Sequence, residues 1–264
     1  MHTVLLPTPA LVAQFQRAGF LVAPDVLSPA EVATLHAGVE RVFAAPSPEA
    51  ALYHSEEIWR PRMFEQGEEF EALIDHPGVA PFIDHLLGED CHIIANNALR
   101  TTPGKTISGW HADECVRFPI PHEVMLDPRI EMPPYIINTH YYLADVDEEV
   151  GPTQFIPGSH RSGRMPDATD MDADGNPVWN GQDVFSAIGK AGTCVLWNDQ
   201  VWHRGGPNVS NGRIRWAVQK AFARRWISQR FYPFVNYRMP EAIIARATPR
   251  RKRLLGFHDI GAYG

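Results

Sequence analysis

CHIIANNAL (91–99) is the first of six short β-like runs that decide the fold of this chain. The others are SGWHAD (108–113), YIINTHYYLADV (135–146), TQFIPGS (153–159), GTCVLWN (192–198) and RIRWAVQKAF (213–222). Gly, Pro and Asn separate these runs, and no helical pattern stands between them. Several short strands in series predict a β-sandwich or a barrel.

The residues before this region show a helical pattern. Apolar residues recur at helical spacing between Leu11 and Phe15. At 28–31, Ser-Pro-Ala-Glu places a capping serine before a proline at the first helical position and a glutamate at the third. A further helix is predicted over 79–87, with Gly88 as its C-terminal cap.

With 264 residues the chain can bury one sizeable core, and β barrels of this length are often single domains. We therefore expect one domain over 1–264. It would comprise a mainly helical part (1–90), a β core (91–225) and a C-terminal extension (226–264).

Two stretches between the β-like runs, 114–133 and 166–183, are rich in turn formers and acids. Loops of this length inside a compact domain are usually functional. We expect both to form the rim of a pocket.

The net charge of −7 argues against nucleic acid or an anionic membrane as a partner, and the basic cluster at 250–253 is expected to be a solvated face. Cys91, Cys115 and Cys194 are widely spaced and form no Cys-x-x-Cys, which favours a reducing compartment. No uncharged apolar run approaches the ~18 residues that a membrane span requires. A cytoplasmic protein is expected.

A candidate metal-binding pattern stands at Trp110-His111-Ala112-Asp113. Residues two apart on a strand project from the same face, so His111 and Asp113 can bind one ion together. Composition alone supplies a His-x-Asp roughly 0.7 times in such a chain, so the motif needs support from elsewhere. The rival His54-Ser55-Glu56 lies in a segment without strand alternation and is interpreted as a surface feature.

A second histidine from another strand would complete the two-histidine, one-carboxylate triad of non-haem Fe(II) oxygenases. His203 is the best candidate, because it follows the strand 192–198 and precedes two glycines that allow close backbone approach. His92 and His140 also lie on predicted strands. For each of these histidines taken alone, a buried structural role is the competing interpretation.

Arg213 and Arg215 follow His203 on the predicted strand 213–222. 2-Oxoglutarate binds iron through its 1-carboxylate and 2-keto oxygen, so its far carboxylate needs a buried partner. A guanidinium suits that role, since it forms bidentate charge-assisted bonds and keeps its proton on burial. Being two residues apart, the two arginines are expected to point to the same side, and the geometry suits either of them.

Taken in order, these motifs resemble the phytanoyl-CoA dioxygenase family of Fe(II)/2-oxoglutarate-dependent oxygenases, and the likeness runs almost from end to end. The shared marks are Phe15, Gly19-Phe20, Val26-Leu27-Ser28, W-H-x-D (110–113), D-V-D-E-E-x-G-P-T…I-P-G-S-H (145–160), W-H-R-G-G-P-N-x-S (202–210), ARRWISQRF (223–231) and LLGF (254–257).

The resemblance implies a mostly β protein with flanking helices, built on a cupin-like double-stranded β-helix, or jelly roll. It implies Fe(II), 2-oxoglutarate and O2 as cofactors, and His111, Asp113 and His203 as metal ligands. The implied reaction is hydroxylation of an unactivated C–H bond of a small-molecule metabolite, with release of succinate and CO2. Because Asp113 is present where related halogenases have a small residue, hydroxylation is expected rather than halogenation.

The resemblance also helps to choose the arginine. Relatives usually place it eleven residues after the distal histidine, and that position is Ile214 here, so this chain departs from the pattern by one residue. Similar sequences have a tryptophan eleven residues after the arginine, and counting back from Trp226 favours Arg215 over Arg213.

Two further cosubstrate contacts are implied by the resemblance. His140 stands eleven residues before Gly151 of the E-x-G-P turn, and Ser108 stands three residues before His111. His160, in the P-G-S-H turn, is expected to be a turn residue rather than a ligand.

Two other classes of protein fit part of this pattern. A cupin-like metal-dependent isomerase or hydrolase could use the same ligands with Zn or Mn, but would not need a buried arginine. A non-catalytic ligand-binding barrel would typically lose one member of the triad. Substrate identity and oligomeric state stay open, since Arg60, Arg62 and Arg100 fit either an anionic substrate group or ordinary exposed positions.

Overall fold

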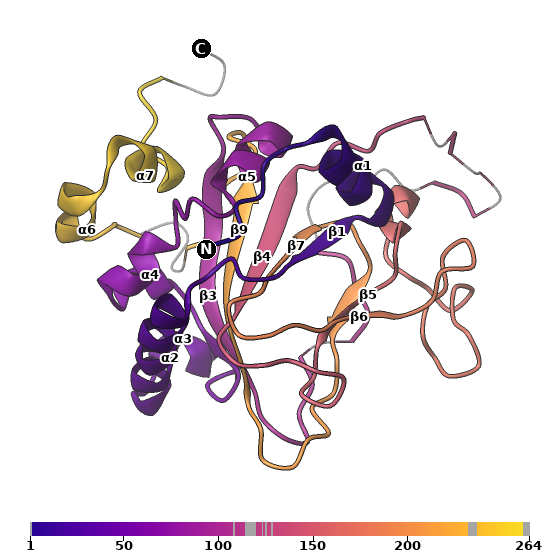
Figure 1. The fold of residues 1–264 in the computed structure, drawn as a ribbon, viewed down its shortest axis with the longest axis horizontal. Coiled ribbons are helices and arrows are strands. Elements are labelled where there is room, and N and C mark those ends of the chain that lie inside the picture. Colours follow the sequence, from indigo (N-terminus) through magenta and orange to yellow (C-terminus); the bar gives the residue numbers. More distant parts are fainter. Residues whose placement is uncertain are drawn as a thin grey trace.

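The structure is a computed structural model that describes residues 2–107, 109–113, 120–122, 124, 126–127, 129–231 and 237–260. Two β-sheets face each other, and helices cover the outer side of the larger sheet (Figure 1). The helices are α1 (Pro9–Ala18), α2 (Pro29–Ala44), α3 (Pro48–Leu52), α4 (Glu68–Ala72), α5 (Ala80–Leu87), α6 (Glu241–Arg246) and α7 (Pro249–Leu254), with short 3-10 helices η1 (Met63–Glu65) and η2 (Ser159–Ser162). The strands are β1 (Phe20–Ala23), β2 (Trp59–Arg60), β3 (His92–Thr101), β4 (Ile136–Tyr142), β5 (Thr153–Phe155), β6 (Phe185–Ala187), β7 (Cys194–Asn198), β8 (His203–Gly205) and β9 (Arg215–Ala223).

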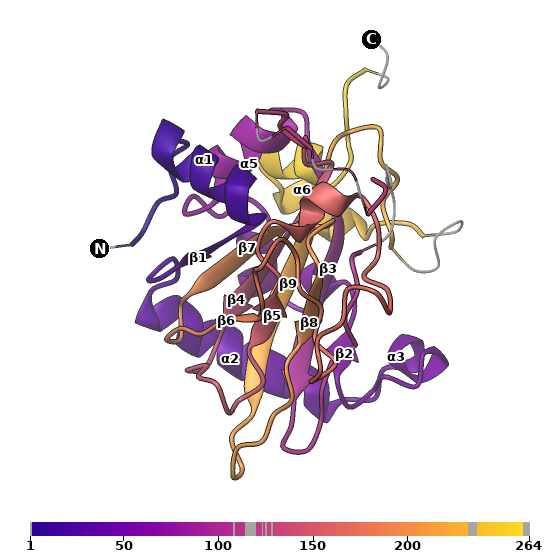
Figure 2. The ribbon, with the colours of Figure 1, turned by 90° about the vertical axis from the view of Figure 1, so that its right-hand side faces the viewer.

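The larger sheet has six strands in the order β1-β7-β4-β9-β3-β2, and the smaller has three in the order β6-β5-β8. Neighbouring strands are antiparallel in both sheets. Figure 2 looks onto the smaller sheet, with the larger one behind it. The predicted fold, a mostly β jelly roll with flanking helices, is therefore confirmed. Among the described residues, no helix is long and apolar enough to cross a membrane.

Both faces of the larger sheet are buried. On the outer face, Val218 and Phe222 of β9 pack with Phe82 of α5 in the main apolar cluster. On the inner face, Trp197 of β7 packs with Phe155 of the smaller sheet in a second cluster. Because side chains alternate along a strand, one set anchors each strand to the helices while the other set builds the space between the sheets.

Helices α2 and α5 begin and end close to where the sequence predicts. The Ser28 hydroxyl accepts a hydrogen bond from the N–H of Glu31 at 3.1 Å, and the Glu31 carboxylate accepts one from the N–H of Ser28 at 2.8 Å. This is the predicted capping box. Helix α5 ends at Gly88, whose φ of 100° is a conformation that glycine adopts without strain.

Replacing Ser28 by alanine is expected to lower the free energy of unfolding by about 1 kcal/mol, because the first turn of α2 loses its side-chain acceptor. Urea denaturation would measure this loss. Thr34→Ala, on the exposed side of the same helix, is the matched control, because the Thr34 hydroxyl bonds only to the carbonyl oxygen of Ala30. Equal losses for the two variants would contradict a capping role for Ser28.

The part predicted as mainly helical also supplies both edge strands of the larger sheet. β1 pairs Phe20 with Trp197, and β2 pairs Trp59 with Leu99. With four and two residues, these strands are too short for their alternation to be visible in the sequence. The β core is therefore not confined to 91–225.

Two of the predicted strands are shorter than expected. In the run 108–113, the described residues form one isolated bridge, between His111 and His203. The run 153–159 leaves the smaller sheet after Phe155 and enters η2, where Gly158 has a φ of 80°. Both runs turn away from their sheet at a glycine-containing segment.

Helices α6 and α7 occupy the C-terminal extension, where the sequence pattern predicts no element. They lie beside the outer face of the larger sheet (Figure 1). Arg250 pairs with Asp84 at 2.7 Å, and Arg251 pairs with Asp75 at 2.8 Å. The basic cluster predicted as a solvated face thus ties α7 to the N-terminal part of the chain.

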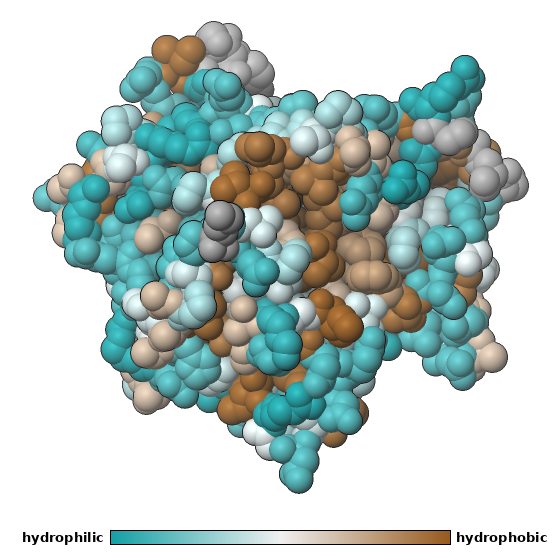
Figure 3. Space-filling view, viewed as in Figure 1, coloured by the Kyte–Doolittle hydropathy of each residue, from teal (hydrophilic) through white to brown (hydrophobic). Residues whose placement is uncertain are grey.

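A hollow opens on the face shown in Figure 3, where apolar side chains gather over β1 and beside β6. Its volume is about 620 Å³, and Phe20 and Phe185 are among its lining residues. Phe20 stacks on Phe155 with 4.5 Å between ring centroids. Both rings belong to the apolar cluster between the two sheets.

Candidate metal centre

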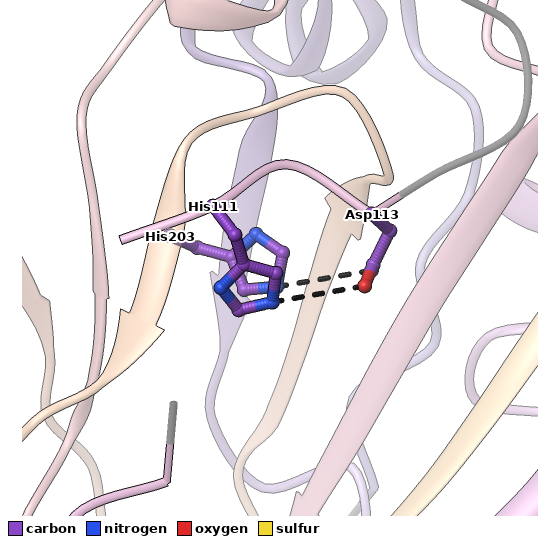
Figure 4. Close-up of side chains that lie close together, drawn as sticks. All are labelled: His111, Asp113 and His203. Carbon is purple, nitrogen blue, oxygen red and sulfur yellow. Dashed lines mark ion pairs between the residues drawn. The ribbon is translucent and has the colours of Figure 1, made fainter. Parts of the chain in front are cut away.

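The three residues predicted as metal ligands converge at one point (Figure 4). His111 Nε2 lies 3.8 Å from Asp113 Oδ1, and His203 Nε2 lies 3.7 Å from Asp113 Oδ2. One ligand atom from each residue lies within 4.8 Å of the others, and among the described residues no other group of this kind occurs. The rival His54 is exposed and lies outside it. The arrangement is that of a facial triad, which leaves further positions on an ion open.

Backbone hydrogen bonds place the two histidines side by side. The N–H of His111 donates to the carbonyl oxygen of His203 at 3.0 Å, and the N–H of His203 donates to that of His111 at 2.8 Å. The two ring centroids are 4.3 Å apart. A single bridge between the end of one loop and the start of β8 is therefore enough to set the spacing of the ligands.

The second nitrogen of each imidazole is engaged by the backbone. His111 Nδ1 lies 2.8 Å from the carbonyl oxygen of Gly109, and His203 Nδ1 lies 2.8 Å from that of Val201. Because a carbonyl only accepts, each Nδ1 carries the proton and each Nε2 presents a lone pair toward Asp113. Burial lowers the pKa of His203 to about 4, which keeps this imidazole in the neutral form that binds metals.

Asp113 is held by two partners. Asn138 Nδ2 on β4 donates to Asp113 Oδ2 at 2.8 Å, and the N–H of Asp113 donates to the carbonyl oxygen of Asp199 at 2.8 Å. Asn138 was not predicted from the sequence, although it stands two residues before His140 on the same strand and so shares its face. Burial and the nearby Asp113 raise the pKa of Asp199 well above its usual value.

Arg215 is buried beside this centre, with 1% of its surface exposed. Its Nη1 donates to Thr153 Oγ1 at 3.3 Å, while its Nε has no hydrogen-bond partner in the part of the chain that the structure describes. No carboxylate of those residues forms an ion pair with it. Burial lowers the pKa of Arg215, yet a guanidinium keeps its proton in proteins. A buried cation without a counter-charge is unfavourable, so this position fits an anionic ligand.

His140 lies between Arg215 and the triad. Its Nδ1 is 3.2 Å from Thr153 Oγ1, and its Nε2 has no partner among the described residues. Burial, together with the charge of Arg215 and the neighbouring His203, lowers the pKa of His140 well below its usual value. Arg215 and His140 thus each bury a polar atom without a partner among the described residues, and these atoms could bind 2-oxoglutarate.

Arg213 has a different environment. It forms ion pairs with Asp147 at 2.6 Å and with Glu149 at 2.9 Å at the surface. The expectation that both arginines point to the same side is wrong, because β9 begins only at Arg215. Ser108, the other predicted cosubstrate contact, lies outside the described residues.

The remaining residues considered from the sequence have structural partners. His92 and His160 bond to backbone carbonyl oxygens at 2.7 and 3.0 Å, and His160 lies in the η2 turn as expected. Arg60 and Arg100 also donate to backbone carbonyl oxygens, and Arg62 pairs with two glutamates. None of these side chains belongs to the metal cluster.

A jelly roll that carries a two-histidine, one-carboxylate triad next to a buried arginine defines the class of non-haem iron oxygenases that use 2-oxoglutarate. The family model described as phytanoyl-CoA dioxygenase (PhyH) matches residues 15–217. The chain therefore belongs to the phytanoyl-CoA dioxygenase family. Membership confirms the predicted enzyme class, a dioxygenase, and the predicted cofactors, iron and 2-oxoglutarate.

Individual relatives are distant. An uncharacterized protein of Mycobacterium tuberculosis is 23% identical over 256 residues, which cover 91% of this chain and 84% of that protein. Dioxygenase af480 of Aspergillus fumigatus is 24% identical over 192 residues, covering 72% of this chain and 55% of that protein.

Two solved structures share the fold. HygX from Streptomyces hygroscopicus, with nickel and 2-oxoglutarate bound, has a TM-score of 0.64 at 16% identity and covers 88% of this chain and 95% of that one. The non-haem alpha-ketoglutarate-dependent carbocyclase SnoK from nogalamycin biosynthesis has a TM-score of 0.60 at 20% identity, covering 92% and 91%.

Proposed function

We propose that this enzyme hydroxylates an unactivated C–H bond of a small-molecule metabolite and releases succinate and CO2. In this proposal His111, Asp113 and His203 hold Fe(II), and Arg215 binds the far carboxylate of 2-oxoglutarate. The observation that carries the proposal is the buried Arg215, which has no carboxylate partner among the described residues and lies on the same side of the sheet as the triad.

The protein's part in this reaction is placement. Iron and 2-oxoglutarate supply the oxidising chemistry when bound, and the chain supplies position, electrostatics and exclusion of water. Thr153 Oγ1 lies within hydrogen-bond reach of both Arg215 and His140 and so orients the two side chains toward one ligand. Trp197 packs against both histidines, with ring centroids 5.4 Å from His203 and 4.6 Å from His140, and adds apolar surface beside them.

Hydroxylation is the outcome that a complete triad favours, because Asp113 leaves no ligand position for a halide. The structural neighbour SnoK is named a carbocyclase, so ring formation is an alternative outcome of the same oxidation. Mass spectrometry of the product separates the two. Hydroxylation adds one oxygen atom, whereas ring closure removes two hydrogen atoms.

Arg215→Met is expected to raise the 2-oxoglutarate concentration needed for half-maximal succinate formation by about 100-fold, because two charge-assisted hydrogen bonds are lost. Arg213→Met is the matched control and is expected to change this value by less than about twofold, since Arg213 faces solvent and its acidic partners. Calorimetric titration of 2-oxoglutarate into the anaerobic Fe(II) enzyme provides a second measurement.

The opposite ranking of the two arginine variants would contradict the role given to Arg215. A metal-dependent isomerase or hydrolase that used the same three ligands would bind no 2-oxoglutarate in either variant or in the parent. The titration thus also tests the alternative class.

A further inference from the structure

A second cavity, of about 450 Å³, opens at the β2–β3 edge of the larger sheet. Four residues of β3 line it: Ala95, Asn96, Asn97 and Leu99. Asn97 is in register with Gln219 on β9, and Gln219 is in register with His140 on β4. Residues paired across strands share a face of the sheet, so the part of the cavity formed by Asn97 and Leu99 lies on the same side as His140 and the metal centre, whereas Asn96 borders it from the other face.

Ile107, one of the lining residues, connects the cavity to β8, the strand that begins with His203. The carbonyl oxygen of Ile107 accepts a hydrogen bond at 2.8 Å from the N–H of Gly205, two residues after His203. A Cβ on Gly205 would lie 2.8 Å from the Cβ of Ile107, so only glycine allows this close approach. The hollow of Figure 3 is lined by other residues, among them Phe20 and Phe185.

The lining of the cavity offers a hydrogen-bond acceptor at Asn97. Asn97 Nδ2 donates to Gln219 Oε1 at 3.0 Å, so the amide nitrogen is engaged within the sheet. Asn97 Oδ1 makes no hydrogen bond to any residue that the structure describes, and the side chain is half-buried. A hydroxyl group of a ligand can donate to this oxygen.

The walls of the cavity are aromatic. Trp59 and Tyr53 meet edge to face with ring centroids 5.7 Å apart, and Phe231 is a buried lining residue. Flat rings pack well against such surfaces. The charged side chains that line the cavity are Arg62 and Arg230, and no acidic side chain is among its described lining residues. A positively charged ligand therefore finds no partner there.

We infer that this cavity binds the substrate and that the substrate is a flat, ring-bearing molecule with a hydroxyl group and no positive charge. The inference rests on the proposed function, because iron held by the triad is what would oxidise a molecule placed here. A volume of about 450 Å³ lies within the range of ~300–1,000 Å³ that is usual for sites of small organic ligands. The hydrogen bond to Asn97 would set which carbon faces the metal.

Calorimetric titration of three probes into the anaerobic Fe(II)/2-oxoglutarate enzyme tests the inference. The probes are 2-naphthol, its methyl ether 2-methoxynaphthalene, and 2-naphthylmethylamine, which is cationic at neutral pH. The ether is expected to bind about five- to tenfold more weakly than the naphthol, because it cannot donate to Asn97 Oδ1. The amine is expected to bind at least tenfold more weakly than the naphthol, because it carries a charge without a partner. Equal affinities for the three probes would overturn the inference.

Variants of the lining residues test whether the probes bind in this cavity. Asn97→Leu is expected to remove the difference between 2-naphthol and its ether, and Leu99→Trp is expected to abolish naphthol binding by filling the cavity. Trp59→Leu, at a half-exposed position, is expected to weaken the binding of all three probes about tenfold, because an aromatic wall of the cavity is lost. Gln14→Leu is the matched control for an amide, because Gln14 lines the hollow of Figure 3 instead. Naphthol binding that survives Leu99→Trp, or that is lost in Gln14→Leu, would overturn the assignment of this cavity.

Titration of 2-oxoglutarate into the same samples reports on folding and separates the two proposals. If 2-oxoglutarate binds but the probes show none of the expected differences, the inference about the cavity fails and the proposed function stands. If the probes follow the expected order in an enzyme that binds no 2-oxoglutarate, the proposed function fails instead.

Discussion

Asp113→Ala is expected to lower 2-oxoglutarate-dependent succinate formation by more than about 1,000-fold. Asp113 is the one carboxylate of the triad, and its two oxygens lie 3.8 and 3.7 Å from the Nε2 atoms of His111 and His203. Loss of a partner that merely orients a ligand typically costs ~10–100-fold in metal affinity or activity, and loss of the ligand itself costs more. Succinate release and Fe(II) affinity, measured on the same preparations, would quantify the effect.

Asn138→Leu is expected to have a smaller effect than Asp113→Ala, and the two variants are compared directly. Since Asn138 holds Asp113 Oδ2 by one hydrogen bond, its loss is expected to weaken Fe(II) binding by about 10–100-fold and to leave some activity. Asp147→Ala removes an exposed carboxylate far from the triad and serves as the control for lost charge. Full activity of Asp113→Ala, or a loss in Asn138→Leu as large as that in Asp113→Ala, would contradict the ligand assignment.

Lys220→Met is expected to raise the free energy of unfolding at pH 7 by about 2–4 kcal/mol. Lys220 lies on the outer side of β9, fully buried, with Nζ 4.7 Å from the Tyr141 ring centroid and no hydrogen-bond partner among the described residues. Burial lowers the pKa of Lys220 from 10.5 to about 7. A tenfold loss of proton affinity corresponds to roughly 1.4 kcal/mol, so keeping this amine in the core is unfavourable to folding.

The pH dependence of stability gives a second measurement of the same effect. Between pH 7 and 10.5 the unfolded chain keeps the Lys220 proton while the folded chain releases it, so this group makes the stability of the parent protein rise with pH. Below pH 7 both states hold the proton and this contribution is constant. In the Lys220→Met variant, this rise of stability with pH is expected to be absent. Lys190→Met, at an exposed lysine paired with Asp145, is the control and should keep it.

The convergence of His111, Asp113 and His203 at one point could be predicted because it depends on local features of the sequence. Two-residue spacing brought His111 and Asp113 together, and the glycines after His203 marked the place where a backbone must come close. Asn138 could not be predicted in the same way, since its bond to Asp113 depends on how a loop crosses β4. That crossing is a tertiary arrangement that no spacing encodes.

The choice between the two arginines shows where the residue pattern reaches its limit. Alternation predicts a common side for Arg213 and Arg215 only if both belong to one strand. In the structure Asn208 Nδ2 and Ser210 Oγ both donate to the carbonyl oxygen of Arg213, at 2.8 and 3.2 Å, and keep it in the preceding turn. β9 therefore begins at Arg215. The family resemblance favoured Arg215 over Arg213, whereas the alternation of side chains along a strand did not distinguish the two.

The elements that the sequence pattern did not predict are short and depend on distant partners. β1 forms because Phe20 to Ala23 pair with β7, some 170 residues further along the chain. Helix α7 has six residues, and its ion pairs to Asp75 and Asp84 hold it against the rest of the protein. Intrinsic propensity is weak in segments of this length, and tertiary contacts decide their structure.

The backbone bridge between His111 and His203 has a consequence for the choice of metal. Hydrogen bonds of 2.8 and 3.0 Å set the distance between the two imidazoles before any ion arrives. Such a preformed set of nitrogen and oxygen ligands follows the general affinity order, in which nickel, copper and zinc bind more tightly than ferrous iron. We expect the metal content of the purified protein to follow the supply of free ions in the cell. Full activity would then require removing the bound metal with a chelator and adding Fe(II) back under exclusion of oxygen.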